Sequence, residues 1–305
     1  MSRTETYAAP RSAWSMARHR FLRHRLAVGS ALFLLLIAFL SLAAPMFEAA
    51  RGLDGNQVNL FARFQLPSAG AWLGRDELGR DVFQRLLQGG QVSLLVGLVT
   101  AFCAALIGTI IGLIAGYHGG WLDAFLMRCT DSVIALPLLP LLIVMAALDL
   151  NKLGLPVVIT ESENISLYRI IFIVALVGWT TVARLVRGAT LSLRERDFVI
   201  AAQSQGASAF RIMKVHILPN LMSPIIVATT LSVGNIILLE SVLSFLGLGI
   251  QPPLPSWGNL LTNAQELVST APWLAIYPGI TIVATVAAFN FLGDGLQDAL
   301  DPKAS

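Results

Sequence analysis

Charged residues are scarce in this sequence of 305 residues, since Asp, Glu, Lys and Arg together make up only 13% of it. A soluble domain usually carries about 25% of such residues. Apolar residues reach 55% of the chain, and the mean hydropathy is +0.71. This composition excludes a disordered chain and an ordinary soluble enzyme, and it predicts a membrane protein.

Cysteines and catalytic motifs are also few. The two cysteines, Cys103 and Cys129, lie in or beside apolar stretches without a CxxC spacing, which argues against a disulfide framework. The sequence has no GxxxxGK[ST], HExxH or GxSxG motif, and its four histidines lack metal-ligand spacing. We therefore expect no catalytic residue, no metal site and no cofactor in this chain. The net charge of +3 is too small to indicate a nucleic-acid partner.

The sequence does contain six long apolar runs, at about 26–47, 92–116, 132–148, 167–186, 221–245 and 273–293. About 20 apolar residues span a bilayer as a helix, so the fold predicted is an all-α integral membrane protein with six transmembrane helices. The first run is longer than the apolar core of a signal peptide, about 7–15 residues, and we interpret it as a retained helix. Pro137 and Pro140 predict a kink in the third run. Arg169 and Arg184, at the ends of the fourth, are expected to snorkel.

Glycines recur every fourth residue in the second run, at Gly108, Gly112 and Gly116. This spacing places three small residues on one helix face and allows another helix to approach closely. We interpret the face as packing within the chain rather than as a dimerisation motif.

Lysine and arginine placement predicts the orientation in the membrane, because these residues accumulate in cytoplasmic loops. With both termini inside, 14 of the 21 Lys and Arg residues fall on the inner side and 7 on the outer side. The expected division is a cytoplasmic segment 1–25, a first transmembrane helix 26–47, an external loop 48–89, a permease domain 90–295 and a cytoplasmic tail 296–305.

The external loops carry two further expectations. Residues 81–87 have an apolar face, with Gln84 and Arg85 on a face that can meet water, which predicts an interfacial amphipathic helix before the second span. Trp257 flanks the last outer loop and is interpreted as an interfacial belt residue.

Polar side chains inside the fifth run are candidates for a transport path. Glu240 lies toward the outer end of this run, where it can line the path or form a structural hydrogen bond beneath the following turn; we favour the structural alternative. Asn235 is the second candidate for the path, although an amide in a span often bonds to a neighbouring helix.

The inner loop between the fourth and fifth spans reads RERDFVIAAQSQGASAFRIMKVHILPN, from Arg194 to Asn220. Its apolar spacing predicts two short helices joined at a Gly-Ala-Ser turn, and Ser208 is placed to cap the second helix. The small residues of this segment leave a smooth surface for a partner: Ala201, Ala202, Gly206 and Ala207.

This loop resembles the EAA loop of ABC-transporter permeases. Ala201, Ala202, Gly206, Ile217 and Pro219 match, at a spacing close to the family pattern. Ile200 stands where the family has its acidic residue, so an acidic contact to the ATPase is not carried over.

Three further segments resemble the dipeptide/oligopeptide/nickel permeases of the DppC/OppC type. They are WLGRDELGRDVF at 72–83, LSFLGLG with its proline-rich continuation at 243–258, and LGDGLQDALDP at 292–302. Together with the inner loop they cover the chain from about residue 72 to its end, and the combination is far more specific than any one of them.

The resemblance implies a type-1 ABC importer permease core and a role in the inner membrane of a bacterium. Such a permease pairs with a sister permease, two cytoplasmic ATP-binding subunits that hydrolyse ATP, and an external solute-binding protein. The EAA loop docks on an ATPase subunit, here through Ala201, Ala202, Gly206, Ala207, Ser208 and Arg211.

The function expected is therefore the import of a small solute, with short peptides preferred. Nickel complexes, opines and other small solutes of the family are alternatives. A secondary transporter driven by an ion gradient is a more distant alternative, because it would need coupling carboxylates at mid-membrane, and only Glu240 is available.

Overall fold

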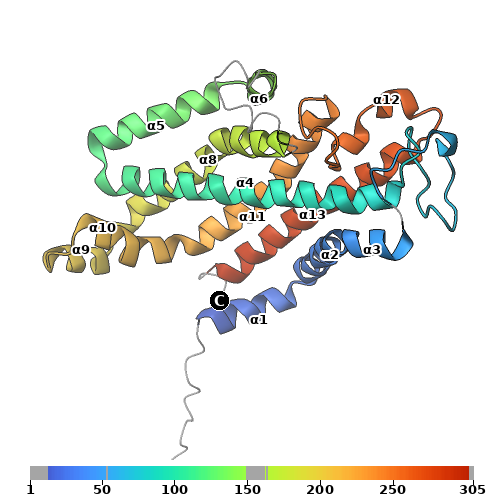
Figure 1. Ribbon diagram of the computed structural model, residues 1–305. Coiled ribbons are helices and arrows are strands. Elements are labelled where there is room, and N and C mark those ends of the chain that lie inside the picture. Colours follow the sequence, from blue (N-terminus) through green and yellow to red (C-terminus); the bar gives the residue numbers. More distant parts are fainter. Residues whose placement is uncertain (1–12, 53, 149–161, 163, 302–305) are drawn as a thin grey trace, which may run out of the picture.

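The computed structural model describes residues 13–52, 54–148, 162 and 164–301. Lys152 and Lys303, counted in the charge analysis, and the outermost residues of the expected terminal segments lie outside these ranges. The described residues form a bundle of long helices with no β-strand among them (Figure 1). The elements are α1 (Ala13–Arg23), α2 (Arg25–Leu42), α3 (Ala44–Arg51), η1 (Leu60–Ala62), α4 (Val82–His118), α5 (Gly120–Ala135), α6 (Leu138–Ala146), α8 (Ile165–Leu193), α9 (Asp197–Ser204), α10 (Ala209–Arg211), the π-helical η3 (Ile212–Ile217), α11 (Leu218–Phe245), η4 (Asn259–Leu261), α12 (Ala264–Leu267) and α13 (Trp273–Leu300).

Five helices in the described part of the chain are long and apolar enough to cross a membrane. They are α2, α4, α8, the continuous helix Ala209–Phe245 and α13. The pair α5 and α6 meets the same criteria together and is bent by 83° between its members. The expected all-α membrane fold is thus confirmed. The bent pair lies where the third of the six spans was predicted.

The bent pair differs from the helix predicted at 132–148. Helix α5 begins 12 residues earlier, at Gly120, and includes Asp123 and Asp131. The hydropathy pattern did not assign this stretch to the span, because its carboxylates lower the local hydropathy. In the structure both carboxylates pair with arginines of α8. The break falls at Leu136, whose ψ of 136° is extended, as is favoured before a proline. The kink is therefore confirmed at Pro137, whereas Pro140 lies in the first turn of α6 and is accommodated there.

Helix α4 is longer than the predicted second span. Its 37 residues begin at Val82 and absorb the amphipathic segment that was expected to form a separate helix. The Asp81 carboxylate caps it by accepting a hydrogen bond from the Gln84 N–H at 2.9 Å, and no helix-breaking residue follows. The expected boundary at residues 89 and 90 consequently falls inside α4.

The glycine face of α4 packs against α8, which confirms the interpretation as packing within the chain. A Cβ added at Gly112 would stand 2.6 Å from the Ala183 carbonyl oxygen and 2.8 Å from Val186 Cβ. One added at Gly108 would stand 2.5 Å from the Trp179 carbonyl oxygen. Real carbon atoms do not approach this closely, so glycine sets the separation of these two helices.

The first span ends earlier than the predicted 26–47. Helix α2 stops at Leu42, and α3 starts again at Ala44 with a proline in its first turn. Proline is tolerated at the start of a helix but removes a hydrogen bond within one, which explains the interruption. The remaining spans contain the predicted ones: α8 holds 167–186, α11 holds 221–245, and α13 holds 273–293.

Candidate functional site

Helix α9 lies at the end of the bundle opposite the segments 54–81 and 246–272, which are predicted to be external (Figure 1). Val199 and Ala202 on one of its faces are buried in an apolar cluster with Val186 of α8 and Ile212 of η3. Its other face carries the exposed side chain of Ala201, beside Phe198 and Ile200, which are 43% and 49% exposed. One face thus fixes α9 to the ends of the long helices, and the other is free to meet a partner.

The predicted turn after α9 is confirmed. Gly206 has φ +79°, a left-handed conformation that favours glycine. Ser208 caps the next helix, because its hydroxyl accepts a hydrogen bond from the Arg211 N–H at 3.4 Å. Gly206, Ser208 and Arg211 are exposed, and Ala207 is half-buried.

Two expectations about this loop are wrong. Ala202 is only 8% exposed and packs inside the protein, so it cannot belong to a surface for a partner. The second short helix is not separate, because α10 continues through the π-helical η3 into α11. Pro219 does not interrupt this path, since it lies in the first turn of α11.

Glu240 is fully buried near the outer end of α11. Its carboxylate accepts hydrogen bonds from the Ser244 hydroxyl at 2.7 Å and from the Ser93 hydroxyl of α4 at 3.1 Å. The same two hydroxyl oxygens accept the backbone N–H groups of Ile250 at 3.0 Å and Trp257 at 3.1 Å. The carboxylate therefore organises two helices and the external segment that follows α11, which favours the structural alternative.

Asn235 lies in different surroundings, and the structure does not bring it together with Glu240. Its side chain is exposed and faces a cavity of about 470 Å³ between α5–α6, α8 and α11. Glu240 does not line this cavity. No hydrogen bond of the Asn235 amide is found within the described ranges, so the amide is available to a solute. Contact of either residue with a solute remains a prediction.

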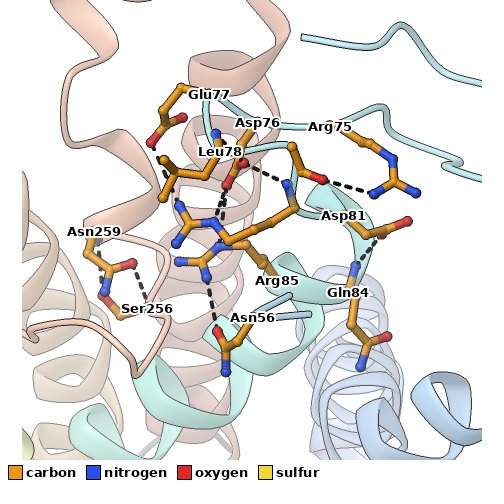
Figure 2. A network of polar contacts seen from close by, with 12 residues as sticks. Asn56, Arg75, Asp76, Glu77, Leu78, Asp81, Gln84, Arg85, Ser256 and Asn259 are labelled. Atoms are coloured by element: carbon orange, nitrogen blue, oxygen red, sulfur yellow. Dashed lines mark hydrogen bonds and ion pairs between the residues drawn. The ribbon is translucent and has the colours of Figure 1, made fainter. Parts of the chain in front are cut away.

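The external segment 72–83 folds into a compact polar network (Figure 2). Asp76 is 5% exposed; its carboxylate accepts hydrogen bonds from the backbone N–H groups of Leu78 and Arg80, both at 2.9 Å, and from the Arg80 side chain at 2.7 Å. Arg85 of α4 lies 3.8 Å from the same carboxylate and donates to Asn56 at 3.1 Å. The Asp76 carboxylate thus gathers the backbone of its own turn, Arg80 and Arg85, and it fixes this segment to the start of α4.

This network overturns two sequence-based expectations. Gln84 and Arg85 were expected to face water but are 1% and 4% exposed, because the external segment folds back over them. Trp257 was expected in an interfacial belt but is 1% exposed, with its indole N–H donating to the Leu86 carbonyl at 3.0 Å. The hydropathy of one segment cannot show that distant parts of the chain bury its polar side chains.

Two ion pairs between α5 and α8 escaped the sequence analysis. Arg187 forms a double hydrogen bond with Asp123, at 2.5 and 2.6 Å, and Arg184 bonds to Asp131 at 2.5 Å. Snorkelling of Arg184 toward the membrane surface stays a prediction, and the structure adds Asp131 as its partner. The available signal was the spacing of opposite charges: Arg184 and Arg187 lie three residues apart and share one face of a helix.

Comparison with protein families identifies the chain. A family described as "binding-protein-dependent transport system inner membrane component" matches residues 108–305. The chain belongs to this family of permeases. A second family, described as the N-terminal TM domain of oligopeptide transport permease C, matches residues 12–65. The permease is therefore a multi-pass inner membrane protein, in agreement with its long apolar helices.

Relatives of this permease extend the similarity over nearly the whole chain. It is 39% identical to a dipeptide transport system permease protein, DppC, of Alkalihalophilus pseudofirmus, over 96% of this chain and 90% of the relative. It is 40% identical to a glutathione transport system permease protein, GsiD, of Pectobacterium atrosepticum, over 96% and 92%. It is 37% identical to an oligopeptide transport system permease protein, OppC, of Bacillus subtilis, over 96% and 90%.

A solved structure supports the fold of the permease. An inward-facing structure of the MetNI methionine ABC transporter contains a chain that matches with a TM-score of 0.56 and 18% identity. The match covers 71% of this chain and 96% of that one. The type-1 importer permease fold expected from the sequence is thus confirmed.

Proposed function

We propose that this chain is the permease subunit of an ABC importer for short peptides and forms half of the translocation path with a sister permease. The observation that carries the proposal is the 37–40% identity, over 96% of the chain, with permeases named for dipeptides, oligopeptides and glutathione. All three solutes are short peptides. The sequence has no P-loop, so ATP is hydrolysed by two partner ATP-binding subunits, and an external solute-binding protein delivers the peptide. The chain itself is not an enzyme and binds no cofactor.

Helix α9 is the proposed docking element for an ATP-binding subunit. This role is supported by the exposure of Ala201, Gly206, Ser208 and Arg211 around one short helix. Ala202 and Ala207 support the same docking element, because they pack it against the ends of α8 and α11. Because Ile200 replaces an acidic residue and is half-exposed, the contact is expected to be largely apolar.

The proposed orientation places both termini and α9 in the cytoplasm. It is supported by the excess of Lys and Arg on that side and by a shared pocket that residues from α1, the start of α11 and the end of α13 line together. The proposed division is that of the sequence: a cytoplasmic segment 1–25, a first helix within 26–47, an external part within 48–89, a permease domain 90–295 and a tail 296–305.

The experiment that tests this function measures uptake of labelled di- and tripeptides in cells with and without the chain. It is repeated with an inactivated partner ATPase while the ion gradient is kept intact. We expect uptake to require both the chain and an active ATPase. Uptake that persists without ATPase activity would indicate an ion-coupled transporter. Loss of nickel uptake alone, assayed alongside, would transfer the protein to the metal-transporting branch.

The docking role is tested by Ala201→Trp, which adds bulk to the exposed face of α9 without disturbing its backbone. We expect peptide uptake to fall to background while the amount of chain in the membrane is unchanged. Gly206→Trp should act in the same way, and Gly206→Asn is the matched control, because asparagine tolerates the left-handed conformation. Normal uptake with Ala201→Trp would refute docking at this surface.

A further inference from the structure

The cavity between α5–α6, α8 and α11 has a volume suited to a small solute. At about 470 Å³ it falls in the range of about 300–1,000 Å³ typical of ligand pockets. Most of its wall is apolar, and its polar side chains converge from two helices: Thr180, Thr181 and Arg184 from α8, and Ser232 and Asn235 from α11. An apolar wall with a few polar groups is the usual composition of a binding site.

Arg184 is the one charged residue in this wall. It is 19 residues from the start of α8 and 9 from its end, so it lies roughly 28 and 14 Å from these ends at 1.5 Å per residue. An arginine within a predicted span, here 167–186, usually faces a partner or a cavity and is a candidate for a solute path. Both apply here: its guanidinium contacts Asp131 at 2.5 Å, and the two side chains remain 51% and 59% exposed.

A neighbouring ion pair gives α5 and α8 a second connection. Arg187 and Asp123 already join α8 to α5 with two hydrogen bonds, and this pair is more enclosed, at 34% and 13% exposure. Arg187 does not line the cavity. The two ion pairs connect the same helices, but only the pair of Arg184 and Asp131 places its arginine in the wall of the cavity.

We propose that Arg184 binds the C-terminal carboxylate of the transported peptide, and that Asp131 occupies the place of this carboxylate while the cavity is empty. The inference rests on the proposed function. A guanidinium binds a carboxylate through two parallel hydrogen bonds, and the Asn235 amide and Ser232 hydroxyl are placed to bond to the peptide backbone. Because the peptide must displace the Asp131 carboxylate, part of the energy of the new contact offsets the loss of the old one, and the peptide can leave again.

The test compares variants of the complete transporter, with all its partner subunits, in proteoliposomes loaded with ATP. With trialanine as solute, we expect Arg184→Gln to slow uptake about tenfold, the loss expected for one charge-assisted contact. Asp131→Asn should leave the rate within about twofold of wild type, since only a competing carboxylate is lost. Arg187→Gln is the matched control and should retain uptake per assembled complex. Equal losses in Arg184→Gln and Asp131→Asn would overturn the proposal, because they would mean a purely structural ion pair.

A second measurement needs no change at the ion pair. Ser232→Cys is introduced with Cys103→Ser and Cys129→Ser, and alkylation of the new thiol is followed in the solubilised complex. We expect trialanine to slow alkylation severalfold and trialanine amide to have no effect. Equal effects of the two peptides would refute the carboxylate contact. If the wild-type complex transports no peptide at all, the proposed function fails and the inference with it; normal peptide transport by Arg184→Gln defeats the inference alone.

Discussion

Glu240 shows how a carboxyl group inside an apolar helix is satisfied by neighbouring hydroxyl groups. Its carboxylate has hydroxyl donors from α4 and α11, and these hydroxyls hold the backbone of the next segment at Ile250 and Trp257. The sequence identified Glu240 as important because a carboxylate in an apolar run needs a partner. Ser244 was visible as that partner, since it lies one helical turn away. Ser93 was not, because it is 147 residues distant.

Glu240→Ala should destabilise the protein rather than only block transport. Removing the carboxylate leaves buried hydroxyl donors unsatisfied, at a cost of about 2 kcal/mol. We expect a lower apparent melting temperature of the purified chain in detergent and less chain in the membrane. Asn235→Ala is the matched control on the same helix and should melt like wild type. Normal stability of Glu240→Ala combined with lost uptake would instead support a role in the path.

Gly79→Ala should disrupt the external polar network. Gly79 has φ +73°, and an added Cβ would overlap the Asn59 carbonyl oxygen, so the backbone near Asp76 must shift. We expect the segment 52–81 to become sensitive to protease added outside the cell. Gly120→Ala tests for strain alone, because φ there is +57° and no atom lies near the added carbon; it should leave this segment resistant.

At the scale of elements, the sequence predicted the number and order of the membrane helices because each apolar run is long enough to span a bilayer. It failed where a charged stretch belongs to a helix, as in α5, whose carboxylates are neutralised by α8. It failed again where an interfacial segment merges with a span, as at the start of α4. Both errors concern helix ends, where contacts with other segments decide how far a helix continues.

The α4–α8 interface provides a test at this scale. Gly112→Leu would place a side chain against the Ala183 carbonyl and Val186, forcing the two helices apart. We expect the protein to be degraded or absent from the membrane fraction, as measured by quantitative immunoblotting. Gly178→Ala, on α8, meets only Ala104 Cβ at 3.5 Å, an ordinary contact, and should accumulate normally. Normal levels of Gly112→Leu would show that the separation of α4 and α8 is adjustable.

For the whole molecule, the family and the local structure of the inner loop were predictable from the sequence, whereas the cavity was not. The loop is a local feature, with its turn, cap and short helix within about 20 residues of one another. The cavity is formed by residues from α5, α6, α8 and α11, and the pairing of Arg184 with Asp131 spans 53 residues. Such combinations depend on how helices pack, which hydropathy along the chain does not encode.

The orientation of the whole molecule can be measured with single cysteines. Ser68 lies in the external segment and Ser204 at the end of α9, and both side chains are exposed. We expect a membrane-impermeant thiol reagent to label Ser68→Cys in intact cells and Ser204→Cys only after the membrane is opened. Both variants should carry serine in place of the two native cysteines. The reverse labelling pattern would place α9 and the termini outside and exclude docking to a cytoplasmic ATPase.

Helices α10, η3 and α11 form one continuous helix, so a tilt at one of its ends would move the other end. It runs for 37 residues, from Ala209 to Phe245, which corresponds to about 55 Å at 1.5 Å per residue. A tilt of about 5° about one end would displace the other by about 5 Å, close to the rise of one helical turn. Its inner end adjoins α9 and its outer end adjoins the segment anchored by Glu240. If the helix moves as a rigid body, a small movement imposed at the end beside α9 would displace the end beside Glu240 by about the length of one amino acid.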